Sequence, residues 1–281
     1  MTRIEQFGWR GPVEPGIGRI VSAHGDYYHL VADERPEGEF LARKKKSAFR
    51  ASPHAPSAAI LSPCVGDFVR FRYNARGDSL ITGILPRFSH FERKDPTARR
   101  STQTLAVNFD TLFIMMSLNE DFSVPRIRRY LELAADMGRA EAVVVVTKAD
   151  LRQPGDEAYL ADLAAATDGV ARVLMISARS GEGIDGVNGY VRPGRTVAFV
   201  GSSGVGKSTL VNLLAGEDWQ ATQDVQEWSG RGRHTTTSRE LIMLPSGAMV
   251  VDTPGIREIG LPGEREERLV KGESTHRYRK C

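Results

Sequence analysis

One segment of the chain has the residue types and spacing that predict phosphate binding. Residues 201–208 read GSSGVGKS and fit the pattern GxxxxGK[ST] at every position. In such a loop the backbone N–H groups turn toward phosphate oxygens, Lys207 reaches the β- and γ-phosphates, and the Ser208 hydroxyl ligates Mg²⁺. An apolar segment precedes the loop and a helical pattern follows it. The predicted phosphate-binding residues are Gly201, Ser202, Ser203, Gly204, Val205, Gly206, Lys207, Ser208 and Thr209.

Two later motifs are typical of residues that sense a γ-phosphate. Asp252 and Gly255 lie in the sequence DTPG directly after an apolar segment. There the carboxylate can hold Mg²⁺, directly or through water, and the Gly255 N–H can meet the γ-phosphate. The segment GRHTTT at 232–237 offers Thr235 and Thr236 for the same phosphate, with Thr236 as a candidate Mg²⁺ ligand. A plain polar turn is the alternative for this segment, and which threonine serves stays open.

Two earlier motifs predict which base is bound. Thr147, Lys148 and Asp150 belong to the sequence TKAD. A carboxylate at Asp150 can accept hydrogen bonds from the N1–H and the 2-amino group of guanine, which adenine does not present, and the Lys148 stem can lie along the ring. Ser177 and Ala178 follow another apolar segment, where backbone N–H groups can read guanine O6. Each motif is common by itself, but the full set predicts a guanine-nucleotide site.

These motifs occur in an order that predicts a rearranged chain. Common small GTPases begin with the phosphate loop, whereas here the base-reading motifs at 147–150 and 177–178 come first. A sheet keeps its strand neighbours when the chain is opened elsewhere. We therefore predict a circularly permuted P-loop GTPase domain of α/β class. Its catalytic candidates are Lys207, Asp252 and Gly255.

Alternating apolar segments and helical patterns must position these motifs. The sequence predicts strands over 111–116, 142–146, 173–176, 196–200, 241–244 and 249–251. It predicts helices from Pro125 to Gly138, over 157–166 and over 208–214. Together these elements predict a mainly parallel sheet covered by helices.

The sequence of the N-terminal region predicts a small all-β barrel. Short strands are expected over 19–22, 27–31, 39–42, 67–73 and 80–85, separated by turn residues. An OB-fold is favoured, with an SH3-like barrel as the alternative. Residues 86–105 are polar and basic and are predicted to be a linker.

Charge is unevenly distributed along the 281 residues. The net charge is +3, but residues 1–105 hold 17 Lys and Arg against 11 Asp and Glu, a net of +6. Such asymmetry indicates a nucleic-acid or anionic-surface contact made by one part of the chain. A basic loop after the third strand is one candidate, and a solvated charge run is its alternative. The candidate RNA contacts are Arg43, Lys44, Lys45, Lys46, Arg70 and Arg72.

Cysteine content and hydropathy exclude several classes of protein. Cys64 and Cys281 are the only cysteines, too few for a disulfide framework or a four-thiolate zinc site. The N-terminus lacks the apolar region of a signal peptide, and no apolar run approaches the ~18 residues of a membrane span. We therefore expect a cytoplasmic protein that does not contact membranes.

The chain resembles the ribosome small subunit-dependent GTPase A (RsgA/YjeQ) family over roughly residues 15–262. The resemblance rests on RKDP at 93–96, NFDTLFIMMSLNEDF at 108–122, TKAD, RPGRTVAFVGSSGVGKSTLVN at 192–212, GRGRHTTT at 230–237 and VVDTPGIRE at 250–258. It implies an OB-fold that binds 16S ribosomal RNA over residues 1–100. It also implies a GTPase domain over 101–262, stimulated by the small ribosomal subunit and acting late in 30S maturation. Mg²⁺, GTP and GDP are the implied ligands, and we expect a monomer.

The resemblance also shows where the chain departs from relatives. Ile256 stands where Ras-like enzymes place a water-orienting glutamine, so another group must orient the water. His234 is a candidate for that role, and a structural or exposed histidine is the alternative.

The family carries a C-terminal zinc domain with a Cys/Cys/His/Cys ligand set. The charged tail at 263–281 offers only His276 and Cys281, so we expect a disordered remnant without those zinc ligands. A nucleotide-gated RNA-binding module with little turnover is the alternative function, and Asp150 disfavours an ATP-dependent protein.

Overall fold

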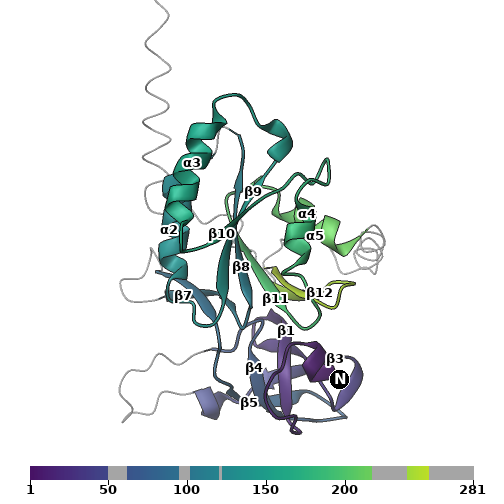
Figure 1. The fold of residues 1–281 in the computed structure, drawn as a ribbon. Coiled ribbons are helices and arrows are strands. Elements are labelled where there is room, and N and C mark those ends of the chain that lie inside the picture. Colours follow the sequence, from purple (N-terminus) through teal and green to yellow (C-terminus); the bar gives the residue numbers. More distant parts are fainter. Residues whose placement is uncertain (50–61, 95–101, 120–121, 217–238, 253–281) are drawn as a thin grey trace, which may run out of the picture.

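The computed structural model describes residues 1–49, 62–94, 102–119, 122–216 and 239–252. The chain forms a small β-barrel below and a larger layered α/β part above it (Figure 1). The two parts are joined by a continuous sheet of eleven strands, because one barrel strand also pairs with the edge strand of the α/β part.

The barrel consists of five strands and is closed. They are β1 (Ile17–His24), β2 (Tyr27–Ala32), β3 (Arg35–Lys44), β4 (Phe68–Arg72) and β5 (Ser79–Ile84). Their order is β1-β2-β3-β5-β4, and β4 pairs back with β1. The pairing of β3 with β5 is parallel and every other pairing in the barrel is antiparallel. This five-stranded closed barrel confirms the predicted OB-fold over the SH3-like alternative.

Alternation along the barrel strands explains its core. The inside of the barrel contains the side chains of Leu30, Val69, Phe71 and Ile81. On β4, Arg70 and Arg72 alternate with Val69 and Phe71 and are exposed. One prediction fails in part here. The basic run is predicted to be a loop, but Arg43 and Lys44 are the last two residues of β3. Arg43 pairs with both β2 and β5, and Lys44 pairs with β5. Basic residues can occupy these positions because the hydrogen bonds between strands are made by the backbone.

The upper sheet contains the predicted parallel strands. They are β8 (Thr111–Ser117), β9 (Glu141–Thr147), β10 (Arg172–Met175), β11 (Thr196–Val200) and β13 (Met249–Asp252), with β12 (Arg239–Met243) antiparallel at the edge. The order is β10-β9-β8-β11-β13-β12, so β8, β9 and β10 precede β11 in sequence but extend the sheet on its far side. The circularly permuted arrangement is thus confirmed. Strand β8 is buried at all seven positions, as its continuous apolar run predicts.

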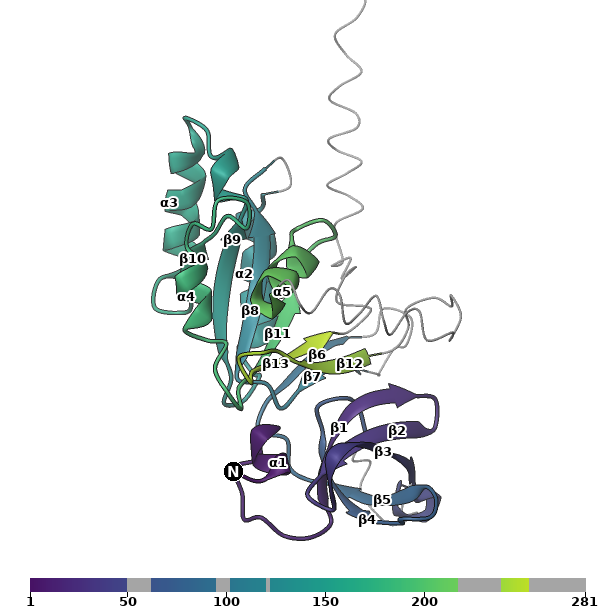
Figure 2. The ribbon, with the colours of Figure 1, turned by 90° about the vertical axis from the view of Figure 1, so that its right-hand side faces the viewer.

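Helices cover both faces of this sheet (Figures 1 and 2). On one face lie α2 (Val124–Ala134) and α3 (Asp156–Thr167), and on the other lie the short α4 (Ile184–Asn188) and α5 (Lys207–Ala215). The Ser123 hydroxyl caps α2 by accepting from the Arg126 N–H. The predicted end at Gly138 is wrong, because α2 ends at Ala134 and Gly138 lies in the turn beyond, with φ +84°.

The predicted linker at 86–105 is also wrong over much of its length. Strands β6 (His90–Lys94) and β7 (Thr102–Val107) form an antiparallel pair. Phe91 and Leu105 from these strands are buried in the main core, which explains why polar neighbours did not prevent strand formation.

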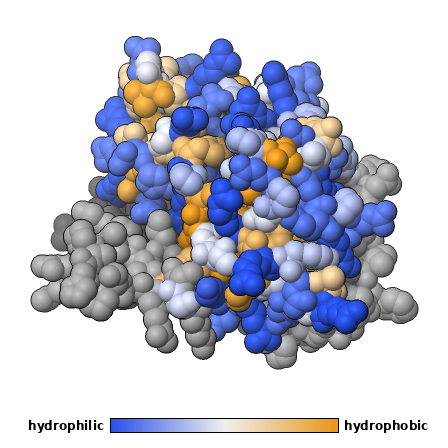
Figure 3. Space-filling view, turned by 90° about the horizontal axis from the view of Figure 1, so that it is seen from below, coloured by the Kyte–Doolittle hydropathy of each residue, from blue (hydrophilic) through white to orange (hydrophobic). Residues whose placement is uncertain are grey.

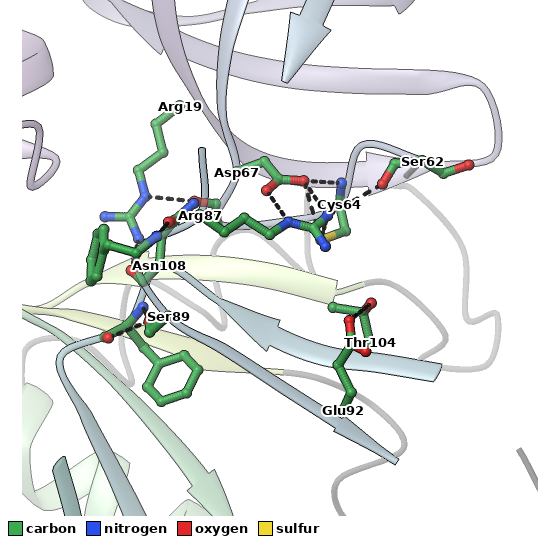
Figure 4. A network of polar contacts seen from close by, with 12 residues as sticks. Arg19, Ser62, Cys64, Asp67, Arg87, Ser89, Glu92, Thr104 and Asn108 are labelled. Atoms are coloured by element: carbon green, nitrogen blue, oxygen red, sulfur yellow. Dashed lines mark hydrogen bonds and ion pairs between the residues drawn. The ribbon is translucent and has the colours of Figure 1, made fainter. Parts of the chain in front are cut away.

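The barrel and the sheet meet through several polar and apolar contacts. A short N-terminal helix, α1 (Arg3–Gln6), lies beside the junction (Figure 2). The Arg87 guanidinium donates to both carboxylate oxygens of the fully buried Asp67, at 2.8 and 2.9 Å (Figure 4). These hydrogen bonds outweigh the effect of burial, which alone would lower the pKa of Arg87, and raise that pKa.

Candidate functional site

The sequence motifs gather at one edge of the upper sheet. The strands β9, β10, β11 and β13 run parallel, and each is followed at its C-terminal end by one of the predicted motifs. Ligands of open α/β sheets bind at this edge, outside the carboxyl ends of the strands. The fold therefore brings together the predicted base-reading and phosphate-binding residues, which lie up to about a hundred positions apart.

The phosphate loop begins with a glycine that no other residue could replace without strain. Gly201 has φ +151°, and a Cβ there would lie 2.5 Å from the Met115 carbonyl oxygen of the neighbouring strand β8. Gly206 precedes α5 with φ +99°. The backbone can thus curl tightly before the helix begins at Lys207, which places helix N–H groups and the loop on one side.

Lys207 lies across the loop it belongs to. Its ammonium Nζ donates to the carbonyl oxygens of Gly201 and Ser202, at 2.6 and 2.7 Å. These contacts hold the cation over the loop, where incoming phosphate oxygens can replace carbonyls as partners. Ser208 and Thr209 are exposed on the first turn of α5, so their hydroxyls are open to a ligand.

Thr147 ties the base-reading loop to the phosphate loop. Its hydroxyl donates to the Val205 carbonyl oxygen at 2.7 Å, and both residues are buried. Lys148, the next residue, has left-handed backbone with φ +58°, uncommon for a residue other than glycine. This strain is typical of functional loops and turns the chain so that Asp150 reaches the surface.

Asp150 is held by the second base-reading motif. The buried Ser177 hydroxyl donates to the Asp150 carboxylate at 2.6 Å. This hydrogen bond lowers the pKa of Asp150, and the nearby positive charge of Arg179 acts in the same direction. The carboxylate therefore stays ionised and exposed at neutral pH, ready to accept hydrogen bonds from a base.

The remaining predicted contacts are described only in part. Asp252 is the last residue of β13, beside β11, but its side chain is outside the described part. His234, Thr235, Thr236 and Gly255 also lie outside the described residues. Within the described ranges, no three His, Cys, Asp or Glu side chains gather as metal ligands, and no helix is long and apolar enough to cross a bilayer.

The basic candidates for RNA contact lie on the barrel, away from the nucleotide edge. Several already contact acidic side chains: Arg43 with Asp78, Lys44 with Asp26, and Arg70 with Glu14. The Arg43 guanidinium also lies over the Tyr27 ring, 4.4 Å from its centroid. Lys45 and Arg72 are exposed, and the side chain of Lys46 is outside the described part.

Sequence reasoning missed one contact within the site and one buried arginine at the barrel junction. It assigned Ser177 a role through its backbone, whereas the structure shows its hydroxyl holding Asp150. It also missed Arg19, which lies at the opposite end of the strands that carry the phosphate loop and Asp252. The only signal for Arg19 was an arginine in the middle of the apolar segment IGRIV.

Comparison with known families gives a match over most of the upper part. The model of the RsgA GTPase family matches residues 84–262. This family consists of GTPases, which are hydrolases. The matched region contains every base-reading and phosphate-binding residue predicted above, and it begins at Ile84, the last residue of β5.

Several curated proteins are similar over a large part of the chain. A small ribosomal subunit biogenesis GTPase RsgA 2 of Lactiplantibacillus plantarum is 44% identical, covering 86% of this chain and 66% of its own length. RsgA proteins of Leptospira interrogans and Methanosarcina acetivorans are 38% and 41% identical, covering 94% and 75% of this chain. The chain spans 72% and 57% of those two relatives.

Two solved structures share the fold. The crystal structure of YjeQ from Thermotoga maritima has a TM-score of 0.62 at 24% identity, covering 87% of this chain and 76% of that one. The structure of YloQ, described as a circularly permuted GTPase, has a TM-score of 0.55 at 21% identity, covering 87% and 73%.

Proposed function

Because the chain belongs to the RsgA GTPase family, we propose that it hydrolyses GTP to GDP and phosphate in late maturation of the small ribosomal subunit. The observation that carries this proposal is that the exposed Asp150 carboxylate and the glycine-rich loop at 201–206 lie at the same edge of the sheet. Asp150 lies in the segment after β9 and Lys207 is the first residue of α5, and the Thr147 hydroxyl links the segment after β9 to the loop that precedes α5. Relatives that match this chain are named as biogenesis GTPases of that subunit.

The proposed nucleotide contacts follow from the chemistry of each group. Asp150 accepts from guanine, the backbone at Ser177 and Ala178 meets O6, and residues 201–209 hold the phosphates. Lys207 stabilises the negative charge that develops on the transferred phosphoryl group.

Mg²⁺ is proposed to bind with GTP, held by oxygen donors of the chain. The Ser208 hydroxyl and the Asp252 carboxylate would hold it, with Thr236 as a third ligand, because hard cations prefer such oxygens. The exposure of Ser208 on the first turn of α5 supports this assignment. When bound, the ion would neutralise charge on the β- and γ-phosphates.

The attacking water needs an orienting group. Ile256 occupies the position after Gly255 and cannot orient water by hydrogen bonding. We therefore infer slow hydrolysis by the isolated chain, with acceleration on the ribosome. His234 is the candidate within the chain for this role.

The barrel is proposed to bind 16S ribosomal RNA. Its end of the molecule carries mainly hydrophilic side chains among the described residues (Figure 3). Arg43, Lys45, Arg70 and Arg72 can contact phosphates, and the partly exposed rings of Tyr27 and Tyr73 can stack on bases. We propose an RNA-binding unit over residues 1–100 and a GTPase unit over 101–262, in a cytoplasmic monomer.

Turnover of GTP by this chain, with and without purified small ribosomal subunits, tests the proposal. We expect slow release of phosphate alone and strong stimulation by saturating subunits. Large subunits at the same concentration serve as the matched control and should not stimulate. GTP binding without stimulation would instead favour the nucleotide-gated RNA-binding module.

A further inference from the structure

Arg19 lies at the centre of the junction between the barrel and the upper sheet. It belongs to β1 and is 1% exposed. Its guanidinium donates to groups from four separate segments: the carbonyl oxygens of Phe7 (2.6 Å), Asn108 (2.7 Å) and Gly66 (3.3 Å), and the Thr196 hydroxyl (3.0 Å). Figure 4 shows Arg19 pointing from the barrel toward the segment that contains Asn108. One barrel side chain therefore fixes several parts of the fold.

Arg19 contacts both of the strands that lead to the nucleotide edge, β11 and β13. Thr196 is the first residue of β11, and Met249, whose sulfur is 3.4 Å from an Arg19 nitrogen, is the first residue of β13. The strand β11 ends directly before Gly201, and β13 ends at Asp252. Arg19 thus holds the starts of both strands. The five residues of β11 between this point and Gly201 span about 17 Å at the usual rise of a strand.

A second connection runs through backbone pairing. On the barrel side, Ser22 of β1 pairs with Glu240 of β12, and Glu240 pairs in turn with Asp252 of β13. The strand β12 also begins three residues after Thr236, a proposed γ-phosphate contact. The barrel therefore pairs directly with β12, and only this strand separates it from β13, which carries the proposed Mg²⁺ ligand Asp252.

The chemistry of Arg19 makes this junction sensitive to displacement. Burial lowers the pKa of Arg19 to about 9, so the group remains a cation at neutral pH, helped by the charge of Asp110. A buried cation is stable only while its hydrogen bonds are made. A shift of the barrel that broke them would leave the charge unpartnered.

We propose that Arg19 is a positioning residue for the nucleotide site, which it acts on from the barrel by holding the starts of β11 and β13. Barrel docking and nucleotide binding then form one coupled equilibrium, and each must affect the other by the same factor. A ligand on the barrel would change nucleotide affinity without touching the nucleotide. This proposal rests on the proposed guanine-nucleotide site.

The test compares GDP affinity and GDP-induced hydrogen-exchange protection in the full chain. For the natural sequence, GDP should slow exchange of amides in β1 as well as in the phosphate loop. Arg19→Met should weaken GDP binding at least about fivefold and remove the GDP-induced protection of β1. Arg19→Lys, which keeps the charge but reaches fewer acceptors, should fall between. Arg76→Met, an exposed arginine in a barrel turn, should behave as the natural chain.

A second variant keeps the test decisive if Arg19→Met does not fold. Thr196→Val removes one acceptor of Arg19 from the upper sheet and leaves the barrel sequence intact. It should lower the GDP-induced protection of β1 while the chain stays folded. The proposal for Arg19 would be overturned if GDP affinity and β1 protection were unchanged both in Thr196→Val and in a folded Arg19→Met. The proposed function would still stand after that result. Failure of the natural chain to bind GDP would overturn the proposed function together with the proposal for Arg19.

Discussion

The Ser177 hydroxyl donates a 2.6 Å hydrogen bond to the Asp150 carboxylate, joining the two loops that are proposed to read the base. Ser177 is fully buried after β10, whereas Asp150 is exposed after β9. The bond points the carboxylate in a fixed direction before any ligand arrives. Preorganised acceptors of this kind lower the ordering cost of binding.

Removing this bond should change the pH dependence of GDP binding. Guanine needs the ionised carboxylate, so affinity falls as pH decreases through the pKa of Asp150, which Ser177 lowers from its ordinary value of 3.8. Ser177→Ala should raise that pKa, so affinity should begin to fall at a higher pH than in the natural chain. GDP titrations between pH 7 and about 3, in both the natural chain and the variant, measure this. Ser180→Ala is the matched control, and an identical pH profile in Ser177→Ala would contradict the assignment.

Thr147→Val should loosen the phosphate loop. The Val205 carbonyl would lose its buried donor, at a cost of roughly 1–3 kcal/mol in the free energy of unfolding. GDP affinity should fall as well, because the loop is less fixed. Thr82→Val removes a hydroxyl contact to a carbonyl on the barrel surface and should change stability by less than about 0.5 kcal/mol. Urea unfolding of both variants makes the comparison, and equal stabilities would count against the Thr147 tie.

Lys207→Ala should remove GTP turnover. The ammonium that now lies over the Gly201 and Ser202 carbonyls would no longer reach the phosphates, so the rate should fall at least about a hundredfold. Phosphate release with small subunits present measures it. Arg128→Ala, which removes an exposed positive charge from α2, should keep the natural rate. Turnover retained in Lys207→Ala would mean that another cation performs this role.

Asp67→Asn should strongly destabilise the fold. Asp67 is fully buried and accepts two hydrogen bonds from Arg87, so its loss leaves a poorly partnered buried cation. The expected cost is roughly 3–5 kcal/mol in the free energy of unfolding. Asp78→Asn breaks the more exposed pair with Arg43 and should cost at most about 1 kcal/mol. Thermal unfolding followed by circular dichroism separates these values, and similar melting temperatures would contradict the buried-pair account.

Local patterns were enough to predict most of the nucleotide edge. The strand before Gly201 is five apolar or β-branched residues, and the glycine spacing restricts that segment to one kind of loop. Strand β8 likewise has a continuous apolar run, because both faces of a parallel sheet are covered. In these segments the periodicity and the tertiary environment favour the same structure.

Other features depend on contacts distant in sequence and could not be predicted. The strands β6 and β7 each have too few apolar residues for a clear alternation, yet Phe91 and Leu105 enter a core built by other segments. Arg19 is polar at a core position only because Phe7, Asn108 and Thr196 supply acceptors there. Nothing near these residues in the sequence indicates those partners.

Nucleotide selectivity is the most direct test of the central claim that this sheet edge reads guanine. GDP, ADP and XDP should be titrated against the natural chain and against Asp150→Asn. The natural chain should bind GDP with at least about a hundredfold preference over ADP and XDP, because only guanine presents both donors to a carboxylate. Asp150→Asn should lose GDP affinity and gain affinity for XDP, since an amide can donate to the additional oxygen of xanthine. Unchanged GDP affinity in Asp150→Asn, or equal binding of GDP and ADP by the natural chain, would contradict the account.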